Sequence, residues 1–421
     1  MEEFEPTLDG QQAAIEAERC LYCYDAPCEA KCPAHVPIPE FIRSIRSGNM
    51  HGARVVLQEA HPLIETCGRI CPEEQFCQSV CTRAKVDAPI RIRELHRFVT
   101  DTTDAADRLE ITAESRGLVA IVGAGPAGLA CSRELRLRGI RCHVFDARGI
   151  GGVPAQEVSW NRCPREIQER EMGLLASRFI DEVRGERITD IGPLLRDYAA
   201  VFIATGLPAE SDLSIGGVGL EGVFHARELL RTVKSGSASG TGRRVGVVGG
   251  GNVAIEVASV LRGEERTRDV TVVYRRGIKE LKAFSEEIDE ATRLGVTYQF
   301  LAIPDRILGE HHVEGLQVTQ ARLCEEDESG RCRFEPLPGS SYVIPLDTVV
   351  IAVGQRADLD AFQGIARDSG GLIQVGENME TSMPGVFAGG DVVSGARTVV
   401  EAVRDGKKAA ESIAAYVAGG K

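Results

Sequence analysis

The sequence repeats one pattern twice, at Leu118–Gly139 and Arg244–Arg262. Each copy has a short β-branched apolar run, then closely spaced glycines, then a helical segment. Because neighbouring parallel strands need a crossover helix between them, this alternation predicts two parallel α/β sheets. Glycines directly after a strand and before a helix are typical of a dinucleotide-binding fold. We therefore expect an α/β protein with two Rossmann-like dinucleotide-binding domains.

The first glycine loop has the G-x-G-x-x-G spacing of a pyrophosphate-binding turn. Gly123 permits a tight turn, Gly125 lets the backbone approach a phosphate, and Gly128 allows close packing of helix on strand. The phosphates would lie at the positive end of a helix. Asp146 ends the next strand, 18 residues after Gly128, where a carboxylate can bond an adenosine ribose. A glycine turn of purely structural use is the alternative.

The second glycine loop keeps this spacing but has alanine at its third position. Its candidate residues are Gly249, Gly251, Asn252 and Ala254. The next strand ends in Arg275 and Arg276, where the first copy has its carboxylate. An arginine can hold an adenosine 2′-phosphate with two parallel hydrogen bonds, so the pair favours NADPH over NADH. Solvated arginines at a strand end are the alternative.

Later segments follow the order expected of a two-dinucleotide flavoprotein. Apolar strands end near Gly206 and Gly354, where the chain would cross between the two domains. A further strand ends at Gly390 and Asp391, where the carboxylate could bond the ribityl or pyrophosphate part of a flavin. This order along the chain predicts FAD as the first cofactor.

The last predicted helix begins at Val399, with Thr398 as its candidate cap. Its positive end could face the flavin N1–O2 edge and stabilise the reduced ring. No catalytic nucleophile or acid–base pair is expected, because hydride transfer requires chiefly the alignment of nicotinamide and flavin.

Eight of the 13 cysteines lie between residues 20 and 81. Because we expect no export signal, disulfides are disfavoured and clustered thiols indicate metal ligands. Proline follows Cys32 and Cys71, as in ferredoxin-like runs. Eight thiolates match two 4Fe–4S clusters, with structural zinc as the competing interpretation. The candidate ligands are Cys20, Cys23, Cys28, Cys32, Cys67, Cys71, Cys77 and Cys81.

Charge and composition exclude some partners. A net charge of −13 argues against nucleic acid and against anionic membrane surfaces. The sequence has no apolar run of about 18 residues, and its acidic start is unlike a signal peptide, so we expect a cytoplasmic protein.

Three zones divide the chain. We expect an α-helical domain with two 4Fe–4S clusters at 1–108, an FAD-binding domain at 109–215 and 345–421, and an NAD(P)H-binding domain at 216–344. In the first zone, Pro37 and Pro39 stand where a helix would start and Gly48 where it would stop.

Longer segments at Cys77–Asp101, Ala352–Phe362 and Arg397–Ile413 carry a resemblance to a known family. The chain resembles the iron–sulfur flavoproteins of the glutamate synthase small subunit family. Within that family it is most similar to the NAD(P)H-oxidising subunits of bacterial dihydropyrimidine dehydrogenases. The resemblance implies electron flow from NADPH or NADH through FAD into the clusters, and it adds Arg397 to the candidate cofactor contacts.

The resemblance also implies interleaved cluster ligation. One cluster would be held by Cys20, Cys23, Cys28 and Cys81. The other would be held by Cys32, Cys71 and Cys77. Its fourth ligand would be His96, which matches a ligating glutamine of the mammalian dehydrogenase, or else Cys67.

The sequence departs from this family at Glu157–Cys163, where relatives have a Gly-Ile-Pro-x-x-Arg-x-Pro stretch that lines the flavin. Gly152 and Pro164 of that region are retained. The NADH-using bacterial relative has an acid where this chain has Arg276, which resembles the NADPH users.

No segment after the second dinucleotide fold is suited to an FMN barrel or a glutaminase domain. The final substrate should therefore be reduced on another polypeptide in a hetero-oligomer. We expect that partner to be an FMN- and iron–sulfur-containing dihydropyrimidine dehydrogenase subunit that reduces uracil or thymine, or a glutamate synthase large subunit. A redox sensor that uses its clusters for regulation is an alternative of another class.

Overall fold

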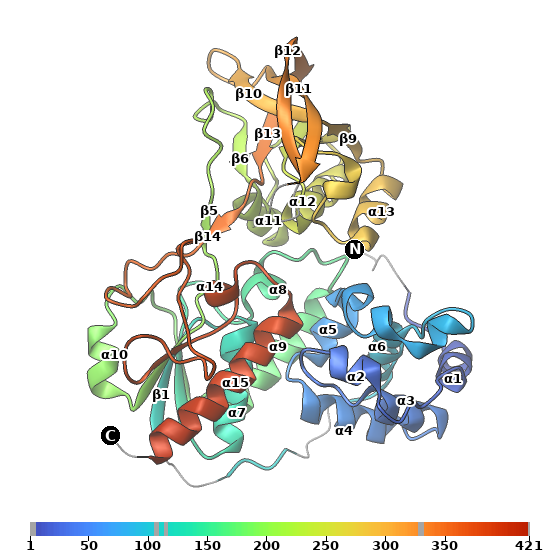
Figure 1. Cartoon of the computed structure of the whole chain (residues 1–421), viewed down its shortest axis with the longest axis vertical. Coiled ribbons are helices and arrows are strands. Elements are labelled where there is room, and N and C mark those ends of the chain that lie inside the picture. The colour runs from blue at the N-terminus through green and yellow to red at the C-terminus, as the bar shows by residue number, and fades with distance from the viewer. Residues whose placement is uncertain (1–5, 105–108, 113–116, 327–331, 420–421) are drawn as a thin grey trace. The chain divides into compact units, whose positions relative to one another are not determined.

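The computed structural model describes residues 6–104, 109–112, 117–326 and 332–419 (Figure 1). The chain divides into two compact units. The first unit comprises Met1–Ala155, Trp160–Pro208 and Ala357–Lys421, and the second comprises Gln156–Ser159 and Ala209–Arg356. Each unit contains one five-stranded parallel sheet.

The first unit begins with a group of short helices that carries the eight clustered cysteines. Helix α3 shows why the sequence folds this way, because Pro39 lies in its first turn and its apolar side chains Phe41, Ile42 and Ile45 are buried on one face. Gly48 then turns the chain at φ +74°. The elements are α1 (Gly10–Glu18), α2 (Pro27–Lys31), α3 (Ile38–Arg46), α4 (Met50–Ala60), α5 (Ile64–Ile70), α6 (Ile92–Thr102) and the 3₁₀ turns η1 (Glu73–Gln75), η2 (Gln78–Val80) and η3 (Thr82–Lys85).

The sheet of the first unit has the strand order β15-β4-β1-β2-β3, with all strands parallel. Helices α7 and α15 pack against each other, and α15 also contacts β4 and β15. The strands are β1 (Leu118–Val122), β2 (Arg141–Phe145), β3 (Glu182–Arg184), β4 (Ala200–Ile203) and β15 (Val386–Ala388). The helices are α7 (Pro126–Leu137), α8 (Gly152–Gln156), α9 (Arg165–Phe179), α10 (Gly192–Asp197), α14 (Asp391–Ser394) and α15 (Val399–Ala418).

One hydrophobic core joins the cysteine-bearing helices to helices α7, α9 and α15 of the first unit. Phe41 and Leu57 from the N-terminal helices belong to the same buried cluster as Met172 and Leu175 of α9 and Val403 of α15. The two parts of this unit therefore share a core.

The sheet of the second unit has the parallel order β6-β13-β7-β8-β9. A three-stranded antiparallel sheet, β10-β11-β12, follows β9 in the chain and includes a long hairpin. The strands are β5 (Ala209–Glu210), β6 (Val223–His225), β7 (Arg244–Val248), β8 (Asp269–Tyr274), β9 (Thr297–Phe300), β10 (Ala302–Leu308), β11 (Gly315–Glu326), β12 (Cys332–Pro345), β13 (Thr348–Ile351) and β14 (Gln355–Arg356). The helical elements are α11 (Ala226–Lys234), α12 (Asn252–Arg262), α13 (Ser285–Arg293) and η4 (Ile278–Glu280).

These two sheets and the helical N-terminal region confirm the predicted fold class. The division into three domains remains a prediction: its boundary at residue 108 lies outside the described residues, and the N-terminal helices belong to the first unit. Across the described part of the chain, no helix is both long and apolar enough to cross a membrane.

Candidate functional site

The first glycine loop connects β1 to α7 and is shaped by close backbone contacts. Gly123 has φ +111°, and a Cβ there would overlap the carbonyl oxygen of Ala204. A Cβ on Gly128 would overlap the carbonyl oxygen of Gly123. At Gly125, by contrast, a Cβ would have its nearest neighbour 3.8 Å away, so the backbone remains accessible. The loop therefore has the tight turn, the close helix packing and the open approach that a pyrophosphate requires.

Asp146 lies beside this loop, as its position at the end of β2 predicts. Its carboxylate accepts hydrogen bonds from the backbone N–H of Ala124 at 2.8 Å and of Arg148 at 2.7 Å. Gly152, at φ +59°, is also close, since a Cβ there would lie 2.8 Å from the Cα of Gly125. The structure thus brings Gly152 and Asp146 to the same loop.

The C-terminal candidates of the first unit gather at the start of α15. Thr398 is the N-cap: its hydroxyl accepts from the backbone N–H of Glu401 at 3.3 Å, and Glu401 accepts in return from the backbone N–H of Thr398 at 3.1 Å. Asp391 accepts from the backbone N–H of Arg397 at 3.2 Å. Gly390, at φ +75°, donates its N–H to Asp405 at 3.2 Å. The helix that begins at Val399 therefore has a capped, ordered N-terminus.

Two candidate glycines lie at strand ends in different units. Gly206 follows β4 in the first unit at φ +63°, and Gly354 follows β13 in the second at φ +137°. Both conformations strongly favour glycine. The structure places these residues at the turns that the sequence predicts. Both turns border the glycine loops, because β4 pairs with β1 and β13 pairs with β7. A Cβ on Gly123 would overlap the carbonyl oxygen of Ala204, and one on Gly249 would overlap that of Ala352.

The second glycine loop lies between β7 and α12. Gly249 has φ +152° and donates its N–H to the carbonyl of Val273 at 3.1 Å. Gly251 has open space where a Cβ would be, and Ala254 is buried in α12. The side chain of Asn252 accepts from the backbone N–H of Phe284 at 2.9 Å, so it orients a neighbouring segment.

Arg275 and Arg276 directly follow β8, the strand next to this loop. Their guanidinium carbons lie 4.8 Å and 5.6 Å from the ring centroid of Phe334. Ligands of open parallel sheets commonly bind at the carboxyl ends of the strands, and the arginine pair lies at that end of β8.

The cysteines of the first set approach one another from three segments. Cys20 follows α1, Cys28 lies in α2 and Cys81 follows η2. Burial raises the pKa of the Cys28 thiol to about 12, with smaller contributions from the charges of Cys20 and Cys81. Burial also raises the pKa of Cys20, and the charges of Cys81 and Cys23 add to it. These charge effects link Cys20 with Cys23, Cys28 and Cys81. The assignment of the four cysteines to one cluster remains a prediction.

The second set lies around the end of α5. Burial raises the pKa of Cys77, and the charges of Glu73, Cys71, Cys32 and Cys28 raise it further. Burial raises the pKa of Cys32 as well, while hydrogen bonds with the backbone of Val36 and its neighbours lower it. Backbone N–H groups directed at sulfur are one means by which proteins tune cluster potentials. Within the described residues, no three His, Cys, Asp or Glu side chains are placed to hold a single metal ion.

His96 lies on α6 and is 8% exposed. Burial lowers its pKa to about 3, and the charges of Arg54 and Arg69 lower it further. Its ring makes a hydrogen bond with the backbone of Ile64, whereas its buried Nε2 has no hydrogen-bond partner among the described residues. A histidine that ligates a metal commonly makes a hydrogen bond to the backbone through its other ring nitrogen, so the buried Nε2 of His96 is suited to ligate iron. Cys67, the alternative, is buried on the adjacent α5.

Three charged side chains that the sequence patterns do not single out join helices α7, α9 and α15 to the cysteine-bearing helices. Arg133 donates to the carbonyls of Gln58 at 2.7 Å and of Glu59 at 2.9 Å, and Lys407 donates to the carbonyl of Ala60 at 2.8 Å. Glu171 caps α5 from α9. No local sequence signal could have identified these residues, because their partners are backbone groups far away in the chain.

Comparison with known proteins matches both regions. A family model described as dihydropyrimidine dehydrogenase domain II, 4Fe–4S cluster, matches residues 1–108, and one for pyridine nucleotide-disulphide oxidoreductases matches residues 118–406. These matches confirm iron–sulfur clusters, FAD and NAD(P)H as the cofactors of an oxidoreductase.

Two curated relatives cover nearly the whole chain. The NADP(+)-dependent formate dehydrogenase subunit beta of Moorella thermoacetica is 38% identical over 93% of this chain, which spans only 60% of that protein. The NAD-dependent dihydropyrimidine dehydrogenase subunit PreT of Escherichia coli is 34% identical over 100% of this chain and 98% of its own length.

Among solved structures, FprA from Mycobacterium tuberculosis superimposes with a TM-score of 0.62 at 18% identity, over 72% of this chain and 85% of that chain. This likeness supports the two-sheet fold alone. The sequence matches go further: the chain belongs to the iron–sulfur flavoprotein oxidoreductase family that includes the dihydropyrimidine dehydrogenase subunit PreT and the glutamate synthase small chains.

Proposed function

We propose that this chain oxidises NAD(P)H through FAD and passes the electrons, through two 4Fe–4S clusters, to a catalytic partner subunit. The observation that carries the proposal is the shared core of the first unit. In it, Phe41 and Leu57 of the cysteine-bearing helices pack in one cluster with Met172 of α9 and Val403 of α15. Bound FAD accepts a hydride and releases single electrons, which the clusters take up one at a time. A common core keeps the two sites together in one unit, as a relay requires.

The residues of the chain bind and orient these groups. Gly123, Gly125 and Gly128 would admit the FAD pyrophosphate, and Asp146 would accept from the adenosine ribose while it holds the loop through Ala124. The N-terminus of α15 would direct its free N–H groups at the flavin. In the second unit, the loop at Gly249 and Gly251, with Arg275 and Arg276, would hold NADPH.

We assign the clusters as two sets of ligands. Cys20, Cys23, Cys28 and Cys81 would hold one cluster. Cys32, Cys71, Cys77 and His96 would hold the other. The buried and unpartnered Nε2 of His96 supports its place in the second set, and Cys67 is the competing ligand.

For the partner we propose a dihydropyrimidine dehydrogenase catalytic subunit that contains FMN and iron–sulfur clusters and reduces uracil or thymine. The extent of the match supports this proposal as well as the sequence identity, because the chain is 34% identical to PreT over 98% of PreT's length. A glutamate synthase large subunit is the second candidate, since the chain also spans 91% of the Halomonas elongata glutamate synthase small chain at 33% identity.

The deciding experiment is anaerobic reduction of the purified full-length chain with NADPH or NADH, with iron, sulfide and flavin analysis of the same sample. We expect about eight irons and about one FAD per chain, and bleaching of both chromophores. Zinc in place of iron, or flavin that neither nucleotide reduces, would overturn the relay and favour a regulatory protein. Mixing with each candidate partner, and measuring uracil- or glutamine-dependent oxidation of the nucleotide, then identifies the acceptor.

A further inference from the structure

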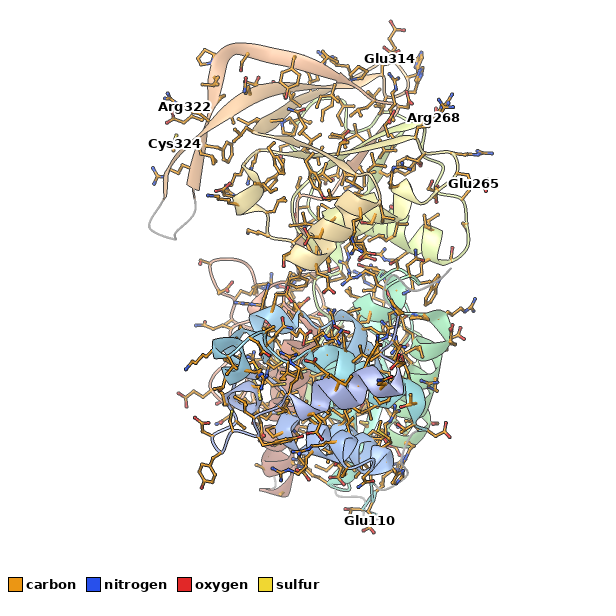
Figure 2. The ribbon with its side chains drawn as sticks, turned by 90° about the vertical axis from the view of Figure 1, so that its right-hand side faces the viewer. Glu110, Glu265, Arg268, Glu314, Arg322 and Cys324 are labelled. Carbon is orange, nitrogen blue, oxygen red and sulfur yellow. The ribbon has the colours of Figure 1, made fainter. Side chains whose placement is uncertain are left out.

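The β11–β12 hairpin extends beyond the parallel sheet of the second unit and passes beside the end of β8. Figure 2 shows this long hairpin, with Arg322 and Cys324 of β11 labelled along it. In the register of the hairpin, Leu323 of β11 lies opposite Phe334 of β12. A Cβ on Gly277, just after the arginine pair, would lie 3.6 Å from Leu323. The hairpin and the loop after β8 are therefore in contact.

Leu301 ties the hairpin to the backbone of the arginine pair. Its N–H donates to the carbonyl of Arg276 at 3.1 Å, and its own carbonyl accepts from the N–H of Ala321 in β11 at 2.7 Å. Leu301 takes the left-handed conformation, φ +56°, to make both bonds. A residue other than glycine is strained in this conformation, so the surrounding structure must hold Leu301 in place.

The loop after β8 is also tied to the second glycine loop. Tyr274, the last residue of β8, lies against Gly250, where a Cβ would fall 2.5 Å from its ring. The carbonyl of Gly250 accepts from the backbone N–H of Lys282 at 2.8 Å. Arg275, the glycine loop and the segment after η4 thus converge at one edge of the sheet.

Phe334 lies under both guanidinium groups. The Arg275 carbon is 4.8 Å and the Arg276 carbon 5.6 Å from its ring centroid, within the range of cation–π attraction. Arg275 is exposed, so without such a contact its side chain would sample many rotamers. Stacking on a ring leaves the N–H edge of a guanidinium available to bond an anion.

We propose that Phe334 is a specificity-determining residue that holds Arg275 and Arg276 ready for the adenosine 2′-phosphate, so that the β11–β12 hairpin makes this chain selective for NADPH. This inference rests on the proposed function of the second glycine loop as the nicotinamide nucleotide site. It adds a residue that lies outside the strand–glycine–helix fold. Phe334 is a positioning residue, because it acts through the two arginines.

The test measures the binding of 2′,5′-ADP and of 5′-AMP to the full-length chain with its cofactors, by calorimetry. These two probes differ only in the 2′-phosphate. In Phe334→Leu we expect the affinity for 2′,5′-ADP to fall roughly threefold to tenfold, with 5′-AMP unchanged. Arg275→Ala should lower the affinity for 2′,5′-ADP by at least about tenfold.

Tyr342→Leu is the matched control, an aromatic residue on the same strand, 36% exposed and opposite Val318. It should leave both affinities unchanged. Equal losses of affinity for both probes in Phe334→Leu would show that Phe334 contacts the part that the probes share, such as the adenine, and would overturn the proposal. No loss of affinity for either probe would overturn it as well. Equal affinity of the unaltered chain for the two probes would also overturn it, while the proposed function would stand. Flavin that neither NADPH nor NADH reduces would instead overturn the proposed function.

Discussion

The carboxylate of Glu171 accepts a hydrogen bond from the backbone N–H of Thr66 at 3.1 Å. It also accepts from the backbone N–H of Glu65 at 2.6 Å. Glu171 lies on α9, whereas Thr66 lies in the first turn of α5, which carries Cys67 and leads into Cys71. A side chain from one part of the first unit therefore caps a helix of the other part.

Replacing Glu171 by alanine should lower the free energy of unfolding of the first unit by about 2 kcal/mol, because two buried N–H groups lose their acceptor. Anaerobic guanidinium unfolding of the full-length chain measures this loss. Glu169→Ala on the same helix is the control, since the Glu169 side chain is 62% exposed and pairs with an exposed arginine. Equal stability of the two variants would contradict the capping role.

The same carboxyl should make stability depend on pH. Burial raises the pKa of Glu171 to about 7, and the charge of Glu65 contributes. Because the folded-state pKa lies above the unfolded value, the stabilising contribution is complete below about pH 4.5 and is lost as the pH rises through about 7. Glu171→Gln should remove this decline, which thermal unfolding at a series of pH values would measure. An unchanged slope would show that another group titrates.

Gly123→Ala should abolish FAD retention and destabilise the first unit, because the new Cβ would overlap the carbonyl oxygen of Ala204 at a φ of +111°. Flavin content after gel filtration, together with the melting temperature, would report both effects. Gly173→Ala is the matched control: it lies on α9 with open space around a Cβ, and it should stabilise the helix by roughly 0.5 to 1 kcal/mol. Normal flavin content in Gly123→Ala would rule out the predicted overlap.

Glu157 forms a buried ion pair with Arg227, at 2.6 Å and with side chains 3% and 5% exposed. Glu157→Ala should therefore destabilise the second unit by about 3 to 5 kcal/mol, because it leaves a buried guanidinium without its carboxylate. Differential scanning calorimetry would measure the loss. Replacing both residues by leucine and methionine should recover most of it. A double variant as unstable as the single one would show that packing, and not the uncompensated charge, is responsible.

His96→Ala should remove one cluster, about four of roughly eight irons, and leave the other. Iron and sulfide analysis with electron paramagnetic resonance of the reduced chain would show this. Cys67→Ser should keep both clusters. The reverse result, loss in Cys67→Ser and retention in His96→Ala, would make Cys67 the fourth ligand.

Local patterns were enough to predict several elements. Pro37, Pro39 and Gly48 predicted the bounds of α3 to within about two residues, because proline and glycine constrain the backbone wherever they stand. Gly123 and Gly249 predicted two strand–helix turns for the same reason. The β10–β12 sheet was not predicted, since its strands lie within a region assigned only to nucleotide binding.

The sequence by itself determined the fold class, the two glycine loops and the cysteine region, because each depends on residues close together in the chain. Only the tertiary structure decided what surrounds them. It brought the carboxylate of Glu171, on α9, to the first turn of α5, 105 residues away in the chain, and it set the ring of Phe334 against the guanidinium of Arg275. No periodicity in the sequence encodes these two contacts. Such pairs form when separate elements pack, so their geometry depends on the whole fold and not on local spacing.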